Sequence, residues 1–255
     1  MPTHLSFDRH VDALARAGAV LREAASAAGP DAPVPTCPGW TVTDLVAHQG
    51  MVHRWAAAHL RGDADHDATA SEREGRRATD PLGWFSQGLT ALIDTLAATP
   101  EDIKARVFLN DAPPPRRFWA RRQAHETTIH SVDAISARLG RWPSAAEADL
   151  DSALAADGID ELLTGFITRA KSRLRSAEPY SVVVRADDTG HAWTLRVSDG
   201  PVVTIVGETA SPEAVFSGSA GQLYLSLWNR ADELTAKGRS DIADDWRSRV
   251  RVEWG

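Results

Sequence analysis

The segment from Arg116 to Leu139 constrains the fold more than any other part of the chain, because it contains no glycine or proline. Apolar residues recur along it, so we expect one long helix. Glu126 and His130 are four residues apart on this helix, which places them on one face, one turn apart. A carboxylate and an imidazole in this arrangement can share one metal ion.

A second histidine on the same helix, His125, does not turn this pair into a protease motif. Metalloproteases with an HExxH helix place two zinc-binding histidines four residues apart and use the glutamate as a general base. His125 and His130 are five residues apart, which turns them about 140° away from each other around the helix. The spacing excludes the protease motif and makes Glu126 a candidate ligand.

A catalytic zinc ion usually has three protein ligands and an open position, so a third ligand must come from elsewhere. The best candidate is His48, in a second amphipathic segment that begins near Thr41. His48 shares an apolar face with Leu45 and Val52 and should point into a helical core. His53 is about 140° away around the same helix, and we expect it at the surface.

These residues also have structural explanations that need no metal. A single inward histidine is more often hydrogen-bonded in a core than bound to a metal ion, and a Glu-x-x-x-His pair is common by chance. A buried carboxylate is costly unless it is paired or binds a cation, which favours the metal site. Asp133 is either a hydrogen-bond acceptor for a ligand imidazole or an exposed carboxylate near Arg138 or Arg141.

Composition excludes several classes of protein. The net charge of −7 argues against a nucleic-acid-binding protein, which usually has a basic face. No stretch approaches about 18 consecutive apolar residues, and no secretory signal is evident, so we expect a cytoplasmic protein without a membrane segment. The single cysteine, Cys37, suits a reducing compartment. It is either a nucleophile near a helix N-terminus or a small structural side chain in a proline-rich corner.

The first half of the chain is expected to form a four-helix bundle that can hold a metal ion between facing helices. Helices are predicted over residues 5–28, 41–55, 81–98 and 116–139. The polar stretch 61–80 is interpreted as a solvated loop or a mobile lid.

The second half changes from a helical pattern to a pattern of strands. A helix is predicted over residues 151–175, followed by β-branched runs at 180–185, 192–197 and 202–206, helices at 218–230 and 241–249, and a short strand at 250–254. Turn residues separate the three runs, which predicts an antiparallel meander. The expected fold class is α+β, with a four-helix bundle over residues 1–148 and a small α/β domain with an antiparallel sheet over residues 149–255.

Two motifs together carry a family resemblance. The first runs from Pro35 to His48 and includes Cys-Pro-Gly-Trp at 37–40, and the second is Arg122-x-x-His125-Glu126-x-x-x-His130-x-x-Asp133. They resemble the maleylpyruvate isomerase family of mycothiol-dependent metalloenzymes, which belongs to the DinB-like four-helix bundles. The segments 199–207 and 221–230 are similar to the small α/β domain of that family.

The resemblance implies that His48, Glu126 and His130 bind a divalent metal ion, with zinc most expected, and that mycothiol is the thiol cosubstrate. A thiol on the metal would be held as a thiolate and would attack a small electrophile. The reaction is then an S-transfer or a maleylpyruvate-type cis–trans isomerisation. The position of Arg122, one turn before Glu126, makes it the first candidate for contact with an anionic substrate, and Arg230 is a weaker candidate for binding the cosubstrate. For each arginine the alternative is a surface ion pair.

Two other functions stay open at this point. A metal-dependent hydrolase would use the same ligands with bound hydroxide, and a non-catalytic metal-containing protein would bind a small molecule without turnover. The expected partners are small molecules in each case, and the chain is expected to be a monomer or a weak homodimer. Abundant arginine and alanine with few lysines are typical of a GC-rich, actinobacterial coding sequence.

Overall fold

The computed structural model describes residues 5–250 of the chain. These residues divide into two compact units, a helical unit of residues 6–108 and 112–143 and a sheet unit of residues 5, 109–111 and 144–250. The expected domain boundary between residues 148 and 149 stays a prediction. Within residues 5–250 no helix is both long and apolar enough to cross a membrane.

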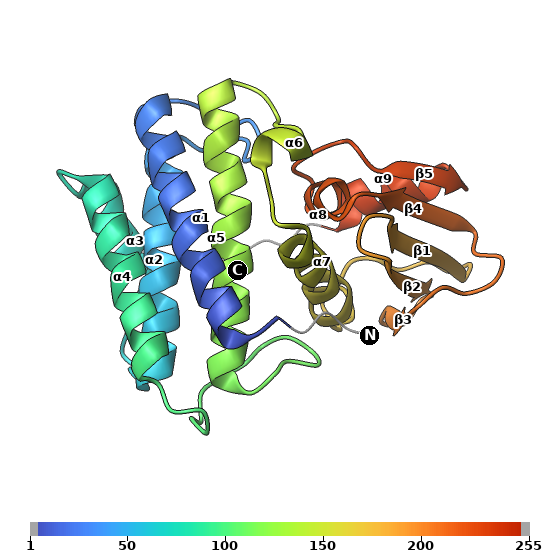
Figure 1. The fold of residues 1–255 in the computed structure, drawn as a ribbon, viewed down its shortest axis with the longest axis horizontal. Helices are drawn as coiled ribbons and strands as arrows, with labels where there is room; N and C mark the ends of the chain where they lie inside the picture. Colours follow the sequence, from blue (N-terminus) through green and yellow to red (C-terminus); the bar gives the residue numbers. More distant parts are fainter. Residues whose placement is uncertain (1–4, 251–255) are drawn as a thin grey trace. The chain divides into compact units, whose positions relative to one another are not determined.

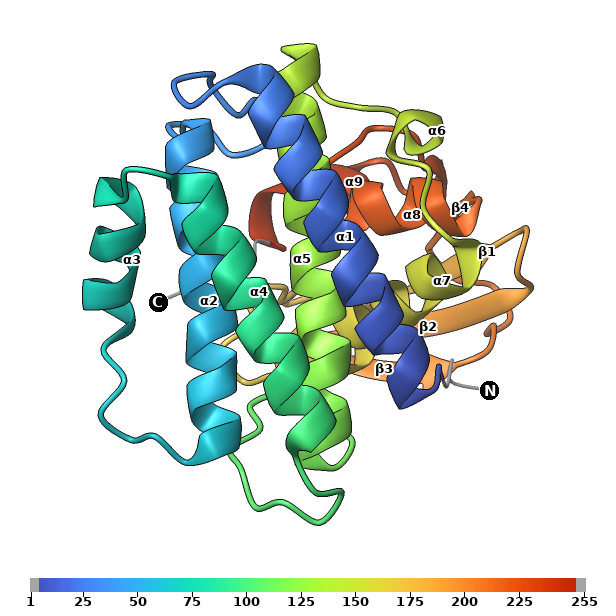
Figure 2. The ribbon, with the colours of Figure 1, turned by 60° about the vertical axis from the view of Figure 1, so that its left-hand side comes forward.

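Four helices of the helical unit run alongside one another and form the expected bundle (Figures 1 and 2). The helices of this unit are α1 (Phe7–Ala28), α2 (Val42–Arg61), α3 (Ala68–Arg77), α4 (Pro81–Ala98) and α5 (Pro115–Leu139). Of these, α1 packs along α5, α2 packs along α4, and α2 also contacts α5. The bundle therefore brings the two segments with the predicted ligands against each other.

The start of α2 is fixed by a reciprocal cap. The Thr41 side chain accepts a hydrogen bond from the Asp44 backbone N–H, and the Asp44 carboxylate accepts one from the Thr41 backbone N–H. Such a capping box satisfies N–H groups that have no partner inside the helix. The cap sets where α2 begins and therefore the level in the bundle at which His48 lies.

The expected loop at 61–80 is wrong for its central part, because residues 68–77 form the helix α3 beside α2 (Figure 2). Two of its residues are buried, Ser71 and Gly75. A Cβ atom at Gly75 would lie only 2.6 Å from the Trp84 ring, so the glycine permits a close approach between α3 and α4. Arg76 also forms ion pairs with Asp44 and Glu72.

The described part of the sheet unit contains one five-stranded sheet with the order β3-β2-β1-β4-β5. Its elements are α6 (Ala145–Ala148), α7 (Ser152–Asp160), the π-helix η1 (Glu161–Phe166), β1 (Tyr180–Ala186), β2 (His191–Val197), β3 (Val203–Val206), β4 (Ala214–Gly218), α8 (Ala220–Leu227), β5 (Thr235–Gly238) and α9 (Asp241–Arg249). The expected antiparallel meander is present as β1, β2 and β3. Two further strands extend it, and β4 pairs with β1 in parallel, so the whole sheet is mixed.

One face of the sheet is apolar and is covered by helices of the same unit. Val184 is paired with Trp193 on β2 and with Phe216 on β4, so the three side chains share a face. The Trp193 indole N–H donates a hydrogen bond to Asp160 at the end of α7, and the Phe216 ring contacts Trp246 of α9. These contacts attach α7 and α9 to the apolar face of the sheet.

Two expectations for the second half need correction or fall outside the described residues. The helix predicted over 151–175 is shorter, because α7 ends at Asp160 and continues only as the π-helix to Phe166. The strand predicted over 250–254 lies outside the described residues, apart from Val250.

Candidate metal centre

The structure brings His48, Glu126 and His130 together in the core of the helical unit. His48 comes from α2, while Glu126 and His130 come from α5. One nitrogen or oxygen of each residue can be chosen so that all three atoms lie within 4.8 Å of one another. Each residue is at most 6% exposed. The predicted ligands therefore converge from two helices into one buried cluster.

Glu126 is held in its ionised form by two neighbours on its own helix. Arg122 Nη2 donates a hydrogen bond to Glu126 Oε2 at 3.2 Å, and His130 Nε2 lies 3.4 Å from Glu126 Oε1. Burial alone would raise the pKa of Glu126, but the His130 hydrogen bond and the Arg122 charge outweigh it and lower this pKa to about 2. The cluster thus contains a permanent negative charge at neutral pH.

His130 is oriented by a carboxylate on the opposite side of its ring. Asp133 Oδ2 lies 2.8 Å from His130 Nδ1, and Asp133 is fully buried. Burial works against the charged imidazolium, but the hydrogen bonds with Asp133 and Glu126 prevail and raise the pKa of His130 to about 9. The interpretation of Asp133 as an acceptor for a ligand imidazole agrees with this geometry, and the exposed alternative is wrong.

Cys37 contacts the same carboxylate from the loop before α2. Its Sγ donates a hydrogen bond to Asp133 Oδ2 at 3.2 Å, and the side chain is half-buried. Cys37, His130 and Asp133 also form a group whose ligand atoms lie within 4.8 Å of one another, so both the structural and the reactive role of Cys37 stay predictions. Asp133 therefore connects the loop to the ligand candidate His130.

His48 contributes a buried nitrogen atom that could serve as a metal ligand. Its Nε2 atom is buried and has no hydrogen-bond partner in the part of the chain that the structure describes. Burial and the neighbouring His130 lower the pKa of His48 to about 4, so the ring is neutral at physiological pH. A buried polar atom without a partner is costly. Two imidazoles and one carboxylate are a known ligand set for catalytic zinc, so these residues fit a divalent cation.

Metal binding should release a proton from His130. At pH 6 the pKa values of about 4, 2 and 9 leave His48 neutral, Glu126 ionised and His130 protonated. A cation bound through His130 Nε2 must displace that proton. We expect about one proton released per Zn²⁺ ion, and an affinity that rises about tenfold per pH unit between about pH 5 and 8. Calorimetric titration in buffers of different ionisation enthalpy measures the release, and a value near zero would contradict the assigned ligand.

The two arginines singled out by the sequence occupy different environments. Arg122 is fully buried and donates a hydrogen bond to Glu126, so in this position it orients the Glu126 carboxylate. Arg230 lies in the sheet unit, where its Nη1 donates to the Trp228 carbonyl at 3.0 Å. Direct contact of either arginine with substrate or cosubstrate stays a prediction.

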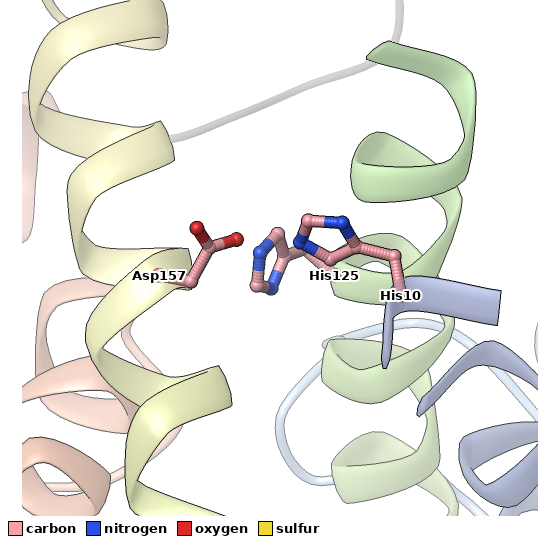
Figure 3. Close-up of side chains that lie close together, drawn as sticks. All are labelled: His10, His125 and Asp157. Carbon is pink, nitrogen blue, oxygen red and sulfur yellow. The ribbon is translucent and has the colours of Figure 1, made fainter. Parts of the chain in front are cut away.

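His125 faces away from the cluster, as its spacing from His130 predicts. Its ring meets the ring of His10 on α1, with ring centroids 6.0 Å apart, and Figure 3 shows both side chains. Asp157, also labelled in Figure 3, belongs to α7 of the sheet unit. The HExxH arrangement is therefore absent around His130 in the described helix.

The expectation that His53 lies at the surface is wrong. Its side chain is fully buried, and its Nε2 lies 2.9 Å from both Gln49 Nε2 and Thr127 Oγ1. The ring also contacts Phe85 of α4, with centroids 5.4 Å apart. The physical reason is that α2 is packed by α4 as well as by α5, so more than one face of it is buried.

The sequence indicates for Trp40 only a place in a turn, whereas the structure places its ring against two of the ligand candidates. The indole centroid lies 5.0 Å from that of His48 and 6.1 Å from that of His130. One feature of the sequence could have indicated this contact: Trp40 lies inside the first motif, eight residues before His48.

Comparisons with known proteins agree with this architecture. The family model described as the mycothiol maleylpyruvate isomerase N-terminal domain matches residues 11–135, and the C-terminal domain of the same family matches residues 153–252. Two solved structures of the mycothiol-dependent maleylpyruvate isomerase, one of them a mutant, give TM-scores of 0.59 and 0.61. Each is 16% identical, and each match covers 93% of this chain and 95% of the other. A search of curated proteins finds no match.

Proposed function

The chain belongs to the mycothiol maleylpyruvate isomerase family, and we propose that it uses a divalent metal ion and a low-molecular-weight thiol to act on a small electrophile. The observation that carries this proposal is the buried cluster of His48, Glu126 and His130, in which His48 Nε2 has no hydrogen-bond partner among the described residues. Catalytic zinc sites use such a ligand set, so we propose zinc as the metal.

The charges around the cluster favour an anionic cosubstrate. Glu126 and Asp133 contribute two negative charges and Arg122 contributes one positive charge, while the two histidines are neutral when they act as ligands. Over these groups alone, a divalent cation would leave one positive charge. A single anionic ligand, such as a thiolate or a hydroxide, would neutralise it, and burial of an uncompensated charge is costly. The bound cation would in turn stabilise the deprotonated form of the thiol.

Neighbouring residues orient the ligand atoms of the cluster for binding a cation. Arg122 directs the Glu126 carboxylate through a hydrogen bond of 3.2 Å, and Asp133 accepts from His130 Nδ1, which leaves Nε2 directed to the Glu126 side. His48 is neutral, so it can offer its Nε2 lone pair at physiological pH. Such outer contacts fix the tautomer and direction of ligand side chains.

We propose mycothiol as the thiol, because the family description names it. A thiolate held in this site would add to an activated double bond, which permits cis–trans isomerisation, or would displace a leaving group in an S-transfer.

A panel of small electrophiles tests this proposal. The Zn²⁺-loaded protein is incubated with each compound, with and without mycothiol, and both the electrophile and the free thiol are followed. We expect conversion that requires the metal and the thiol together, with the thiol consumed in a transfer and regenerated in an isomerisation. Conversion of esters or amides without thiol would instead identify a hydrolase. Tight binding without conversion of any compound would identify a non-catalytic binding protein.

A further inference from the structure

The loop that precedes α2 is attached to α5 beside the ligand candidate His130. The Thr36 and Ser136 hydroxyl groups are hydrogen-bonded at 2.8 Å, and Cys37 Sγ donates to Asp133 Oδ2 at 3.2 Å. Within the loop, the Trp40 backbone N–H donates to the Cys37 carbonyl at 3.0 Å. The backbone of Trp40 is therefore held in a fixed relation to both helices that carry the cluster.

The indole of Trp40 lies against both ligand imidazoles. It is stacked on the His130 ring with an interplanar angle of 17°, and it meets the His48 ring at 56°. The two imidazoles are themselves in edge-to-face contact, with centroids 5.3 Å apart. The three rings form one packed group, in which the indole is the member that is not a ligand candidate.

Hydrogen bonds alone do not explain how His48 is oriented. His130 has Asp133 on one ring nitrogen and Glu126 near the other. His48 Nε2, by contrast, has no hydrogen-bond partner in the described chain, whereas its ring contacts the rings of Trp40 and His130. Trp40 is the neighbouring aromatic side chain, at 5.0 Å between centroids. Aromatic pairs at such distances prefer defined tilted or stacked geometries.

We propose that Trp40 is a positioning residue of the metal centre, whose indole holds the His48 and His130 imidazoles in the arrangement that the cation requires. This inference rests on the proposed metal site and adds a residue that acts through the ligands. Packing against Trp40 restricts the two imidazoles before the ion binds, so less side-chain freedom is lost on binding. This is the general advantage of a preorganised site. Trp40 itself is partly buried.

Cobalt binding to four proteins tests the inference: the natural protein, Trp40→Ala, Trp40→Phe and the control Trp55→Phe. Trp55 is on α2, about 10 Å along the helix axis from His48, and its ring packs on Trp119. Co²⁺ affinity is measured by competition with a chelator, coordination by the visible absorption of Co²⁺, and proximity by quenching of tryptophan fluorescence. Circular dichroism checks the fold of each variant.

We expect Trp40→Ala to lower the Co²⁺ affinity about tenfold or more, the range typical of residues that orient metal ligands, and to change the visible spectrum. Trp40→Phe should recover most of the lost affinity but lose most of the quenching, whereas Trp55→Phe should keep both. If folded Trp40→Ala has the same Co²⁺ affinity and the same visible Co²⁺ spectrum as the natural protein, the inference is overturned. If Trp40→Ala does not fold, the inference is overturned when Co²⁺ quenches the fluorescence of Trp40→Phe as strongly as that of the natural protein. Failure of the natural protein to bind Co²⁺ would overturn the proposed function as well.

Discussion

Replacement of His48 by alanine is expected to lower the affinity for Zn²⁺ by more than about 100-fold, beyond the 10- to 100-fold effect typical of residues outside the ligand set. The variant removes one of three donors and the buried Nε2 atom that has no protein hydrogen-bond partner in the described chain. Conversion of electrophiles should be lost with the metal. Zinc content after dialysis and turnover with mycothiol, measured in parallel, check both expectations.

His59→Ala is the matched control for this experiment. His59 is also on α2, eleven residues after His48, and its ring stacks on Trp119 with centroids 5.2 Å apart. We expect this variant to keep its zinc content and turnover. Retention of one zinc ion per chain by folded His48→Ala would remove His48 from the site and would leave Glu126 and His130 without the third ligand that the proposal needs.

The bundle and the convergence of the ligand candidates could be predicted because the necessary signals are local. The absence of glycine and proline from 116–139 predicts α5, and the Thr41 and Asp44 pair marks the start of α2. Helical periodicity then decides which side chains share a face. Periodicity alone places Glu126 beside His130 and excludes His125 from the same site.

The missed features depend on contacts between segments that are distant in sequence. Helix α3 has no apolar stripe: its buried residues are the small Ser71 and Gly75, of which Gly75 lies against the Trp84 ring, and the helix packs mainly on α2. Periodicity predicts a surface position for His53 because it identifies one buried face, whereas α2 is covered by both α4 and α5. The parallel pairing of β4 with β1 likewise depends on how the chain crosses over, which a strand pattern does not reveal.

Replacement of Arg122 by methionine is expected to destabilise the metal-free protein by about 3 kcal/mol, near the lower end of the cost of breaking a buried ion pair. Both partners are almost fully buried, and the guanidinium directly contacts the Glu126 carboxylate. Removing Arg122 takes one cationic hydrogen-bond partner from the Glu126 carboxylate, so the charged form of Glu126 loses part of its stabilisation. Urea unfolding of the metal-free protein at pH 7 measures the change.

The double variant Arg122→Met/Glu126→Gln separates the loss of the ion pair from the loss of packing. If the cost comes from an uncompensated carboxylate, neutralising Glu126 should recover more than half of the stability lost in Arg122→Met. Saturating Zn²⁺ should also recover part of it in the single variant, because the cation supplies positive charge beside Glu126 and binds the folded state. Equal destabilisation of the single and double variants, with no response to Zn²⁺, would contradict this prediction. It would show that Arg122 stabilises the fold through packing and that its positive charge does not stabilise the Glu126 carboxylate.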